Sequence, residues 1–531
     1  MAAFIFESGA TIKDPSTKKA IRSHAMRNVR ERQRKEGFRD GLTFPGRKKP
    51  RHVRGTFSAA RPLLPAIARS ERDSFSEQTE SQGLQLQDFV QAIDGAQIDS
   101  EDSTGTDVAL THCADFANHH VWRQQLGYVF LTSYYADSVV DAMLKDWHNF
   151  EPGDAAGATL NASRDALCLM GLGALYRDER LLDEGRKRHC LGLRLLRERI
   201  EGPGGVVCDG LLDACYTLAH CQIYQSVSHQ GKGWQIHVEG LHFLLRRRGV
   251  ESIRSPFAHA TLHKMRQIAT MDQLLKRKSS FLSSPEWLLS WRQNDPGIHT
   301  PALQLTDLGL QLSGALEDTD VALHGSTTGK PALGDQLRDV SLRIQSIEYE
   351  LDKWLLNFYH QYGDVQEPYI LTDIAKYPRF ETQCHDIASL LPKVYSFPTL
   401  LSATTHCYLF ILYLAIRMAQ MDLAGLHPTQ PATDIEALAA EANEYAVHLC
   451  RSLAYLSLPQ HRSVGVLACS GPLYWASAWY ERSGDSKKLQ ACQSAREVLE
   501  RDCPTPLNMK APVFAWWMIP SVFEDQGAFA G

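Results

Sequence analysis

The chain has 531 residues, of which 44% are hydrophobic and 22% are charged, a composition that excludes a wholly disordered protein and supplies a large core. Its net charge of −5 also excludes a uniformly polycationic protein. The longest apolar run, Cys407–Ile416, covers about half of the ~20 residues that a membrane span needs. This run therefore predicts a buried core helix.

Positive charge is concentrated near the start of the chain. Residues 18–54 carry 14 lysines and arginines against three acidic residues, a net charge of +11, so the remaining residues carry −16. Such an arm is typical of proteins that contact a polyanion or an import receptor. The candidate contacts for nucleic acid or nuclear import are Lys18, Lys19, Arg22, Arg27, Arg30, Arg32, Arg34, Lys35, Arg47, Lys48, Lys49 and Arg51.

Residues 1–42 form the basic arm, in which Ile21, Ala25 and Val29 recur at helical spacing and predict a short helix. Membrane anchoring is not expected, because the apolar face contains neither Trp nor Leu. The first residues lack the positive n-region of a secretory signal. We therefore expect the nucleus, with the cytoplasm as a second compartment. A solvated tail without a partner stays open as an alternative for the arm.

Residues 43–108 show no periodicity and are rich in Ser, Gln, Glu and Asp, so they predict a mostly disordered linker. Residues 109–531 show helical periodicity almost throughout and hardly any strand signal. This pattern predicts an all-α, irregular superhelical domain. The expected helices are 119–147, 162–176, 178–200, 208–224, 234–248, 258–278, 284–293, 333–362, 380–391, 399–425, 433–457, 472–483 and 485–501.

Several local signals refine this expectation. The segments 162–176 and 178–200 predict a helical hairpin, with Asn161 or Ser163 as the N-cap of the first helix. Gly249 follows an apolar-periodic segment and is a candidate C-cap. Residues 324–334 are rich in Gly and Thr, but their spacing differs from that of a phosphate-binding loop. We therefore expect a plain loop between two halves of the domain.

Metal and catalytic motifs are weak in this sequence. One possible zinc set is His112, Cys113, His119 and His120. Adjacent histidines point to different faces of a helix, so surface or half-buried histidines are the favoured interpretation. Asp137 and Asp141 share a helix face, but the acidic run of a magnesium-dependent prenyl-diphosphate enzyme is missing. We therefore expect neither an enzyme nor a bound cofactor or metal.

Five further motifs occur along the chain. Residues 21–27 read IRSHAMR, residues 160–196 begin LNASRDALC, and residues 277–287 read RKSSFLSSPEW. The pattern W-xx-H-xx-G-xxx-L…RG is matched by Trp234, His237, Gly240, Leu244, Arg248 and Gly249. Near the end stand Arg451, Ser452, Tyr455, Pro472, Leu473 and Trp475. Together these motifs resemble the regulatory domain of fungal-specific transcription factors, over most of residues 1–45 and 110–505.

The resemblance implies an all-α regulatory domain that binds co-regulator proteins, forms homodimers or senses small molecules. That family usually carries a DNA-binding module in which six cysteines hold two zinc ions. No cysteine precedes Cys113 here, and the 12 cysteines include no CxxC pair. They are expected to be reduced and mostly buried.

Three functions therefore stay open. The first is a nuclear transcription regulator that touches DNA through its basic arm or through a partner. The second is a helical protein-interaction scaffold without a role at DNA. The third is an α-helical enzyme or ligand-binding protein on a similar fold.

Overall fold

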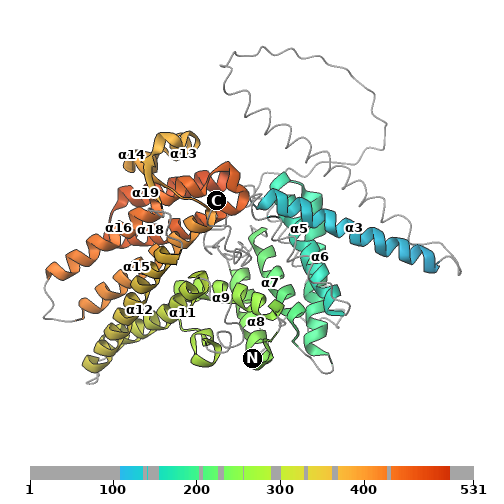
Figure 1. Cartoon of the computed structure of the whole chain (residues 1–531), viewed down its shortest axis with the longest axis horizontal. Coiled ribbons are helices and arrows are strands. Elements are labelled where there is room, and N and C mark those ends of the chain that lie inside the picture. The colour runs from blue at the N-terminus through green and yellow to red at the C-terminus, as the bar shows by residue number, and fades with distance from the viewer. Residues whose placement is uncertain are drawn as a thin grey trace, which may run out of the picture. The chain divides into compact units, whose positions relative to one another are not determined.

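The computed structural model describes residues 108–135, 140, 155–202, 207–224, 232–254, 256–288, 301–327, 333–361, 369–426 and 432–502 (Figure 1). Contacts divide the chain into two units, Met1–Ala114 and Asp115–Gly531. In the described part, 88% of the residues are helical and the only sheet has two strands, so the all-α prediction is confirmed. The basic arm lies outside the described residues, as does the predicted linker up to residue 107.

Long α-helices dominate the described residues, and four 3-10 helices also occur there. The α-helices are α3 (Val108–Tyr134), α5 (Ala155–Tyr176), α6 (Glu179–Glu201), α7 (Asp209–Tyr224), α8 (Lys232–Arg248), α9 (Pro256–Lys276), α11 (Pro301–Thr327), α12 (Leu333–Gln361), α13 (Pro378–Gln383), α14 (His385–Leu390), α15 (Leu400–Ala424), α16 (Ala432–Leu456), α17 (Arg462–Ala468), α18 (Ser470–Ser483) and α19 (Ser486–Asp502). The 3-10 helices are η2 (Val250–Ser252), η3 (Phe281–Ser283), η4 (Ile374–Lys376) and η5 (Pro459–His461).

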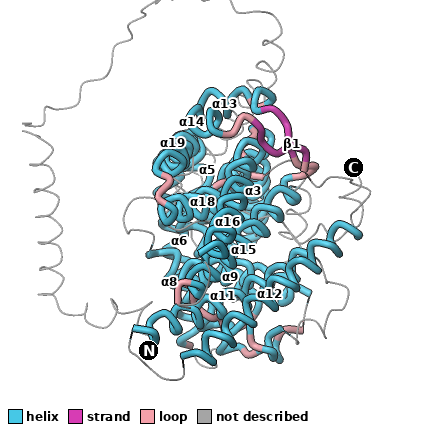
Figure 2. Tube along the Cα trace, turned by 90° about the vertical axis from the view of Figure 1, so that its left-hand side faces the viewer, coloured by secondary structure: helices cyan, strands magenta, loops and turns pink. Residues whose placement is uncertain are grey.

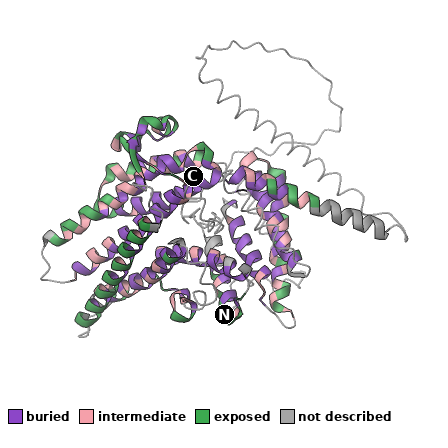
Figure 3. Ribbon diagram, in the orientation of Figure 1, coloured by how far each residue is buried: buried purple, intermediate pink, exposed green. Residues whose placement is uncertain are grey.

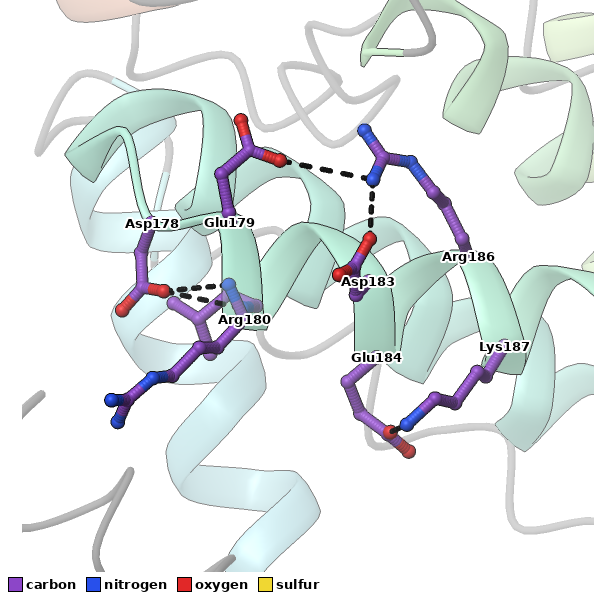
Figure 4. A network of polar contacts seen from close by, with 8 residues as sticks. Asp178, Glu179, Arg180, Asp183, Glu184, Arg186 and Lys187 are labelled. Carbon is purple, nitrogen blue, oxygen red and sulfur yellow. Dashed lines mark hydrogen bonds and ion pairs between the residues drawn. The ribbon is translucent and has the colours of Figure 1, made fainter. Parts of the chain in front are cut away.

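The predicted helical hairpin is confirmed, because α5 and α6 pack against each other along their length. Asp178 is the N-cap of α6, and its side chain accepts hydrogen bonds from the backbone N–H groups of Arg180 at 2.8 Å and Leu181 at 3.4 Å (Figure 4). Its negative charge also suits a helix N-terminus. The exposed ion pairs beyond it, such as Arg186–Asp183, add little stability because water screens them.

Helix α15 lies at the centre of the C-terminal helices. It packs against α11, α12, α16 and α18, and it lies beside α16 in both Figure 1 and Figure 2. By length and composition alone α15 could cross a membrane, but 72% of its most apolar window is buried inside the protein (Figure 3). The predicted core helix is therefore confirmed. Thr399 caps it by accepting a hydrogen bond from the N–H of Ser402.

Helix α12 has two different apolar faces. One face is buried, and its residues follow a heptad spacing: Leu337, Val340, Ile344, Ile347, Leu351, Trp354 and Phe358. This seam packs against α11 and α15. A second row on the helix consists of Leu342, Tyr349 and Leu356, which recur every seventh position and are exposed. We call these three residues the outer row of α12.

A two-stranded antiparallel sheet separates α12 from α15 in the sequence. Strand β1 (Ile370–Asp373) pairs with β2 (Lys393–Ser396), and Thr372 lies opposite Val394. The short helices α13 and α14 lie between the strands in the sequence and pack against each other. The sheet directs Tyr395 inward, where it is 4% exposed.

Several local predictions were wrong. Helix α11 was not expected, although it is 27 residues long, and it overlaps the loop predicted at 324–334, because it continues to Thr327. The single helix predicted at 380–391 is divided into α13 and α14 at Cys384. Asn161 and Ser163 do not cap α5, because that helix already begins at Ala155. The Ser163 hydroxyl instead donates a hydrogen bond to the Thr159 carbonyl at 2.8 Å, as hydroxyls inside helices often do.

Candidate functional site

The twelve candidate contacts of the basic arm lie outside the described residues. So do Asp137, Asp141 and the side chains of the possible zinc set, although the backbone of the zinc set belongs to α3. Among the residues that the structure does describe, no group of three or more His, Cys, Asp or Glu side chains is placed to hold a metal ion. The candidate site is therefore built from the motif residues of the helical body.

The first motif cluster joins α7, α8 and η2. Arg248 ends α8 and forms an ion pair with Asp209, at the first residue of α7. Its guanidinium also donates hydrogen bonds to Ser252, to the hydroxyl at 2.9 Å and to the carbonyl at 3.1 Å. Gly249 follows with a φ of 78°, so the predicted C-cap is confirmed. Arg248 thus fixes the corner after α8.

The other motif residues of α8 with described environments are packed, and Leu244 is 3% exposed. The ring of His237 lies 5.9 Å from that of His189 on α6, and Gly240 is buried. Burial, together with the nearby His189, lowers the pKa of His237 to about 4. His237 is therefore neutral at neutral pH and serves packing. The side chain of Trp234 lies outside the description.

The second motif cluster lies where α16 meets β2 and α18. Ser452 is buried and donates a hydrogen bond to the His448 carbonyl at 2.9 Å. Pro472 is buried in the first turn of α18, where a proline causes no loss of helical hydrogen bonds. The half-buried guanidinium of Arg451 lies 5.9 Å from the centre of the Tyr395 ring. Arg451 therefore faces an aromatic cluster, which is the candidate functional site.

We call this site the tyrosine–histidine cluster, and it is formed by Tyr369, Tyr395, His406, Phe410 and His448. The Tyr369 ring lies 4.3 Å from that of Tyr395 and 5.4 Å from that of His406. The His448 ring stacks on Phe410 at 4.9 Å. The five residues come from the β-sheet region, α15 and α16. Segments distant in sequence thus meet at one place.

One short hydrogen bond defines the chemistry of the cluster. The Tyr395 hydroxyl lies 2.5 Å from Nδ1 of His448. Burial, with a smaller effect of the Arg451 charge, lowers the pKa of His448 to about 4, and burial raises the pKa of Tyr395. At neutral pH both groups are therefore uncharged, and the tautomer of the imidazole sets which of the two donates.

These pKa values decide what the cluster can do. A general acid or base works best when its pKa is near the working pH, and both groups have been moved away from neutrality. Tyr369, His448 and Arg451 are only half-buried. A phenol ring, an imidazole and a guanidinium therefore lie at the edge of the cluster. This combination suits binding of a planar or acidic group better than proton transfer.

A second polar group lies deeper, between α9 and α11. Arg266 and Asp307 form an ion pair, and each is 1% exposed. Burial and the Arg266 charge lower the pKa of the neighbouring His263 to about 3, so this imidazole stays neutral. Because both residues are almost fully buried, we assign the ion pair a structural role.

The sequence motifs indicated Arg451 and Ser452 but missed their aromatic partners. His448, Arg451 and Ser452 are spaced i, i+3 and i+4 on one helix, and this spacing was a usable signal. Tyr369 and Tyr395 could not be linked to them, because a short β-sheet brings them there. No family model, no curated protein and no solved structure matches the chain.

Proposed function

We propose that the chain is a transcription regulator of fungal type that acts in the nucleus and has no zinc-cluster module of its own in this sequence. It reaches DNA through the basic arm or through a partner protein. The observation that carries the proposal is the separation of charge, with +11 on residues 18–54 and −16 on the rest. An acidic body is repelled by DNA, so the arm is the segment suited to phosphate contact.

The helical body supplies the regulatory part in this proposal. Its motif residues support a fixed scaffold, since Arg248 anchors a corner and Ser452 and Pro472 are packed. The tyrosine–histidine cluster is the place where a co-regulator protein or a small molecule would bind. Homodimerisation is a further expectation from the family resemblance.

A salt titration of duplex DNA binding tests the arm. The arm variant replaces six cations with Gln: Lys18, Lys19, Arg22, Arg27, Arg30 and Arg32. The matched control replaces six exposed cations of the body and so has the same net charge: Arg338, Lys353, Lys376, Arg379, Lys393 and Lys487. Each phosphate contact that is lost reduces the slope of log affinity against log salt by about 0.9.

We expect the arm variant to lose a slope of up to about 5, while the control keeps the slope of the native chain. Equal losses in both variants would show that net charge alone matters and would contradict a role for the arm. Weak, salt-independent binding by the native chain would exclude direct DNA contact through the arm. Recruitment by a partner would then be the remaining route to DNA.

One observation favours the scaffold without a role at DNA as a second candidate. The outer row of α12 exposes Leu342, Tyr349 and Leu356, with Tyr349 65% accessible to solvent. Apolar side chains in a regular exposed row are typical of helices that contact another protein. Under this alternative, Ser substitutions in the outer row abolish partner binding, whereas the arm variant leaves it unchanged.

A further inference from the structure

Two cysteines from different helices lie against each other inside the C-terminal part of the body. Cys450 belongs to α16 and Cys492 to α19. Their sulfur atoms are 3.7 Å apart, and the two residues are 3% and 1% exposed. A disulfide has a sulfur–sulfur distance of about 2.05 Å, so small side-chain rotations would bring the pair into bonding range. Both thiols are free in this structure.

The surroundings make the two sulfurs chemically different. The hydrogen bond between them lowers the pKa of Cys492 and raises that of Cys450. Ser477 and the positive charge of Arg496 also favour the Cys492 thiolate, against its burial. Cys492 is therefore the nucleophilic sulfur of the pair.

The other polar neighbours lie beside Cys450, and they lower its pKa less than the hydrogen bond to Cys492 and burial raise it. The Tyr480 hydroxyl lies 4.0 Å from the Cys450 sulfur, and the Lys488 ammonium lies 5.2 Å from the centre of the Tyr480 ring. By contrast, burial raises the pKa of Cys407 on α15 to about 12, so that cysteine stays a thiol. Burial alone raises the pKa of a cysteine. The hydrogen bonds with Cys450 and Ser477 and the charge of Arg496 lower the pKa of Cys492 despite its burial.

We infer that Cys450 and Cys492 form a peroxide-responsive dithiol that oxidises reversibly to a disulfide. The Cys492 thiolate attacks one oxygen of a hydroperoxide, the O–O bond breaks, and the protonated second oxygen leaves as water or an alcohol. The product is a sulfenic acid on Cys492. The Cys450 sulfur then attacks the Cys492 sulfur, the S–O bond breaks, and water leaves.

The balance of this reaction is complete with the peroxide as oxidant. Two thiols lose two electrons and two protons, and one peroxide is reduced by the same two electrons. A dithiol reductant reverses the change by thiol–disulfide exchange. Because both sulfurs are buried, the peroxide reaches them when α19, the last helix in the described part of the chain, opens locally.

The disulfide would change how α19 is held. In the described residues α19 packs mainly against α18 and α14. A bond from Cys492 to Cys450 would tie it covalently to α16, the helix that also carries His448 and Arg451 of the candidate site. Oxidation would therefore restrict opening of α19 beside the helix that forms part of the tyrosine–histidine cluster.

Peptide mapping of the full-length protein tests the inference. The protein is treated with hydrogen peroxide, unfolded, alkylated and digested, with and without prior reduction. We expect a Cys450–Cys492 linked peptide that disappears on reduction, while Cys407 remains fully alkylated. In Cys450→Ala, Cys492 should instead be trapped as a sulfenic acid by a dimedone-type reagent, and Cys407→Ala should keep the linked peptide.

The native chain alone is sufficient to decide, even if a variant does not fold. The inference would be overturned if both cysteines were fully alkylated after a peroxide treatment that is strong enough to oxidise free cysteine in solution. A linked peptide that joins either residue to a different cysteine would overturn it as well. Oxidation of Cys492 to a sulfinic acid without any link to Cys450 in the native chain would also overturn it.

Discussion

Arg266 and Asp307 pair between α9 and α11 where water does not reach them. Removing one partner leaves the other charge buried without its main counter-ion, so we expect Asp307→Ala to lower the free energy of unfolding by about 3–5 kcal/mol. Replacing both residues with apolar ones of similar volume, Arg266→Met with Asp307→Leu, should recover most of this loss. Urea unfolding followed by circular dichroism measures both effects.

A double variant that is less stable than Asp307→Ala alone would contradict this description of the pair. Arg186→Ala serves as the control, because the ion pairs of Arg186 on α6 are exposed. Its effect should stay within about 1 kcal/mol. If Arg186→Ala lowered the free energy of unfolding as much as Asp307→Ala does, burial would not explain how much an ion pair contributes to stability.

His406 gives the fold a dependence on pH. It is 1% exposed among the rings of Phe358, Tyr369 and Phe410, and burial lowers its pKa from 6.5 to about 4. Below about pH 6.5 the imidazole of His406 binds a proton in the unfolded chain but not in the folded chain. The stability contributed by the neutral His406 is therefore fully present above that pH. It is lost as the pH falls toward 4, at about 1.4 kcal/mol per pH unit.

We therefore expect His406→Gln to reduce the fall in unfolding free energy between pH 6.5 and 4, as measured by urea unfolding across this range. The matched control is His360→Gln, which makes the same substitution at an exposed histidine of α12. A steeper fall in the His406 variant than in the native chain would contradict a neutral buried imidazole.

Residue-level contacts were the least predictable part of the chain. The sequence motifs identified Arg248 and Arg451, but they did not show that Asp209 and Tyr395 would meet them. Arg266 and Asp307 lie on different helices, α9 and α11. Their pairing depends on how α9 packs on α11, and no spacing within either helix encodes that contact.

At the scale of elements, α12 separates a structural face from an exposed one. Leu351 lies in the heptad seam and is fully buried, whereas Leu356 in the outer row is 61% exposed. Leu351→Ala should lower the free energy of unfolding by about 2–5 kcal/mol, because it leaves a cavity against α11 and α15. Leu356→Ala should change it by less than about 0.5 kcal/mol. Chemical denaturation of the two variants compares them directly, and equal costs would refute the assignment of faces.

At Gly309, helix α11 is in close contact with both α9 and α15. A Cβ atom there would meet the Tyr408 hydroxyl and lie 2.6 Å from Cγ2 of Thr270. We expect Gly309→Ala to lower the melting temperature, at a cost of about 1–3 kcal/mol. Gly334 on α12 is the matched control, since nothing lies within 4 Å of its Cβ position, and Gly334→Ala should stabilise by up to about 1 kcal/mol. A neutral Gly309→Ala variant would argue against this close approach.

Most helices could be predicted, since apolar spacing shows in α6, α8, α15 and α16. Helix α11 was missed because its sequence, PALQLTDLGLQLSGALEDTDVALHGST, carries glycines and threonines that are usually found in loops. Buried packing outweighs those propensities here. The strands β1 and β2 are only four residues each, too short to give an alternating pattern.

At the scale of the whole molecule, the charge distribution gave the strongest expectation. The basic arm and the acidic body are distinguished by composition alone, and the all-α class follows from periodicity. The tyrosine–histidine cluster could not be foreseen, because its members come from three parts of the chain. Composition therefore points to the class of partner, while the candidate regulatory site depends on tertiary packing.

The proposed role at DNA is tested most directly by mapping the tagged full-length protein on chromatin in the organism that encodes it. The account predicts enrichment at discrete promoter regions, together with changed transcription of the neighbouring genes when the protein is removed. The untagged strain provides the background. A signal at promoters no higher than that background, from a protein that is expressed and folded, would contradict a role in transcription.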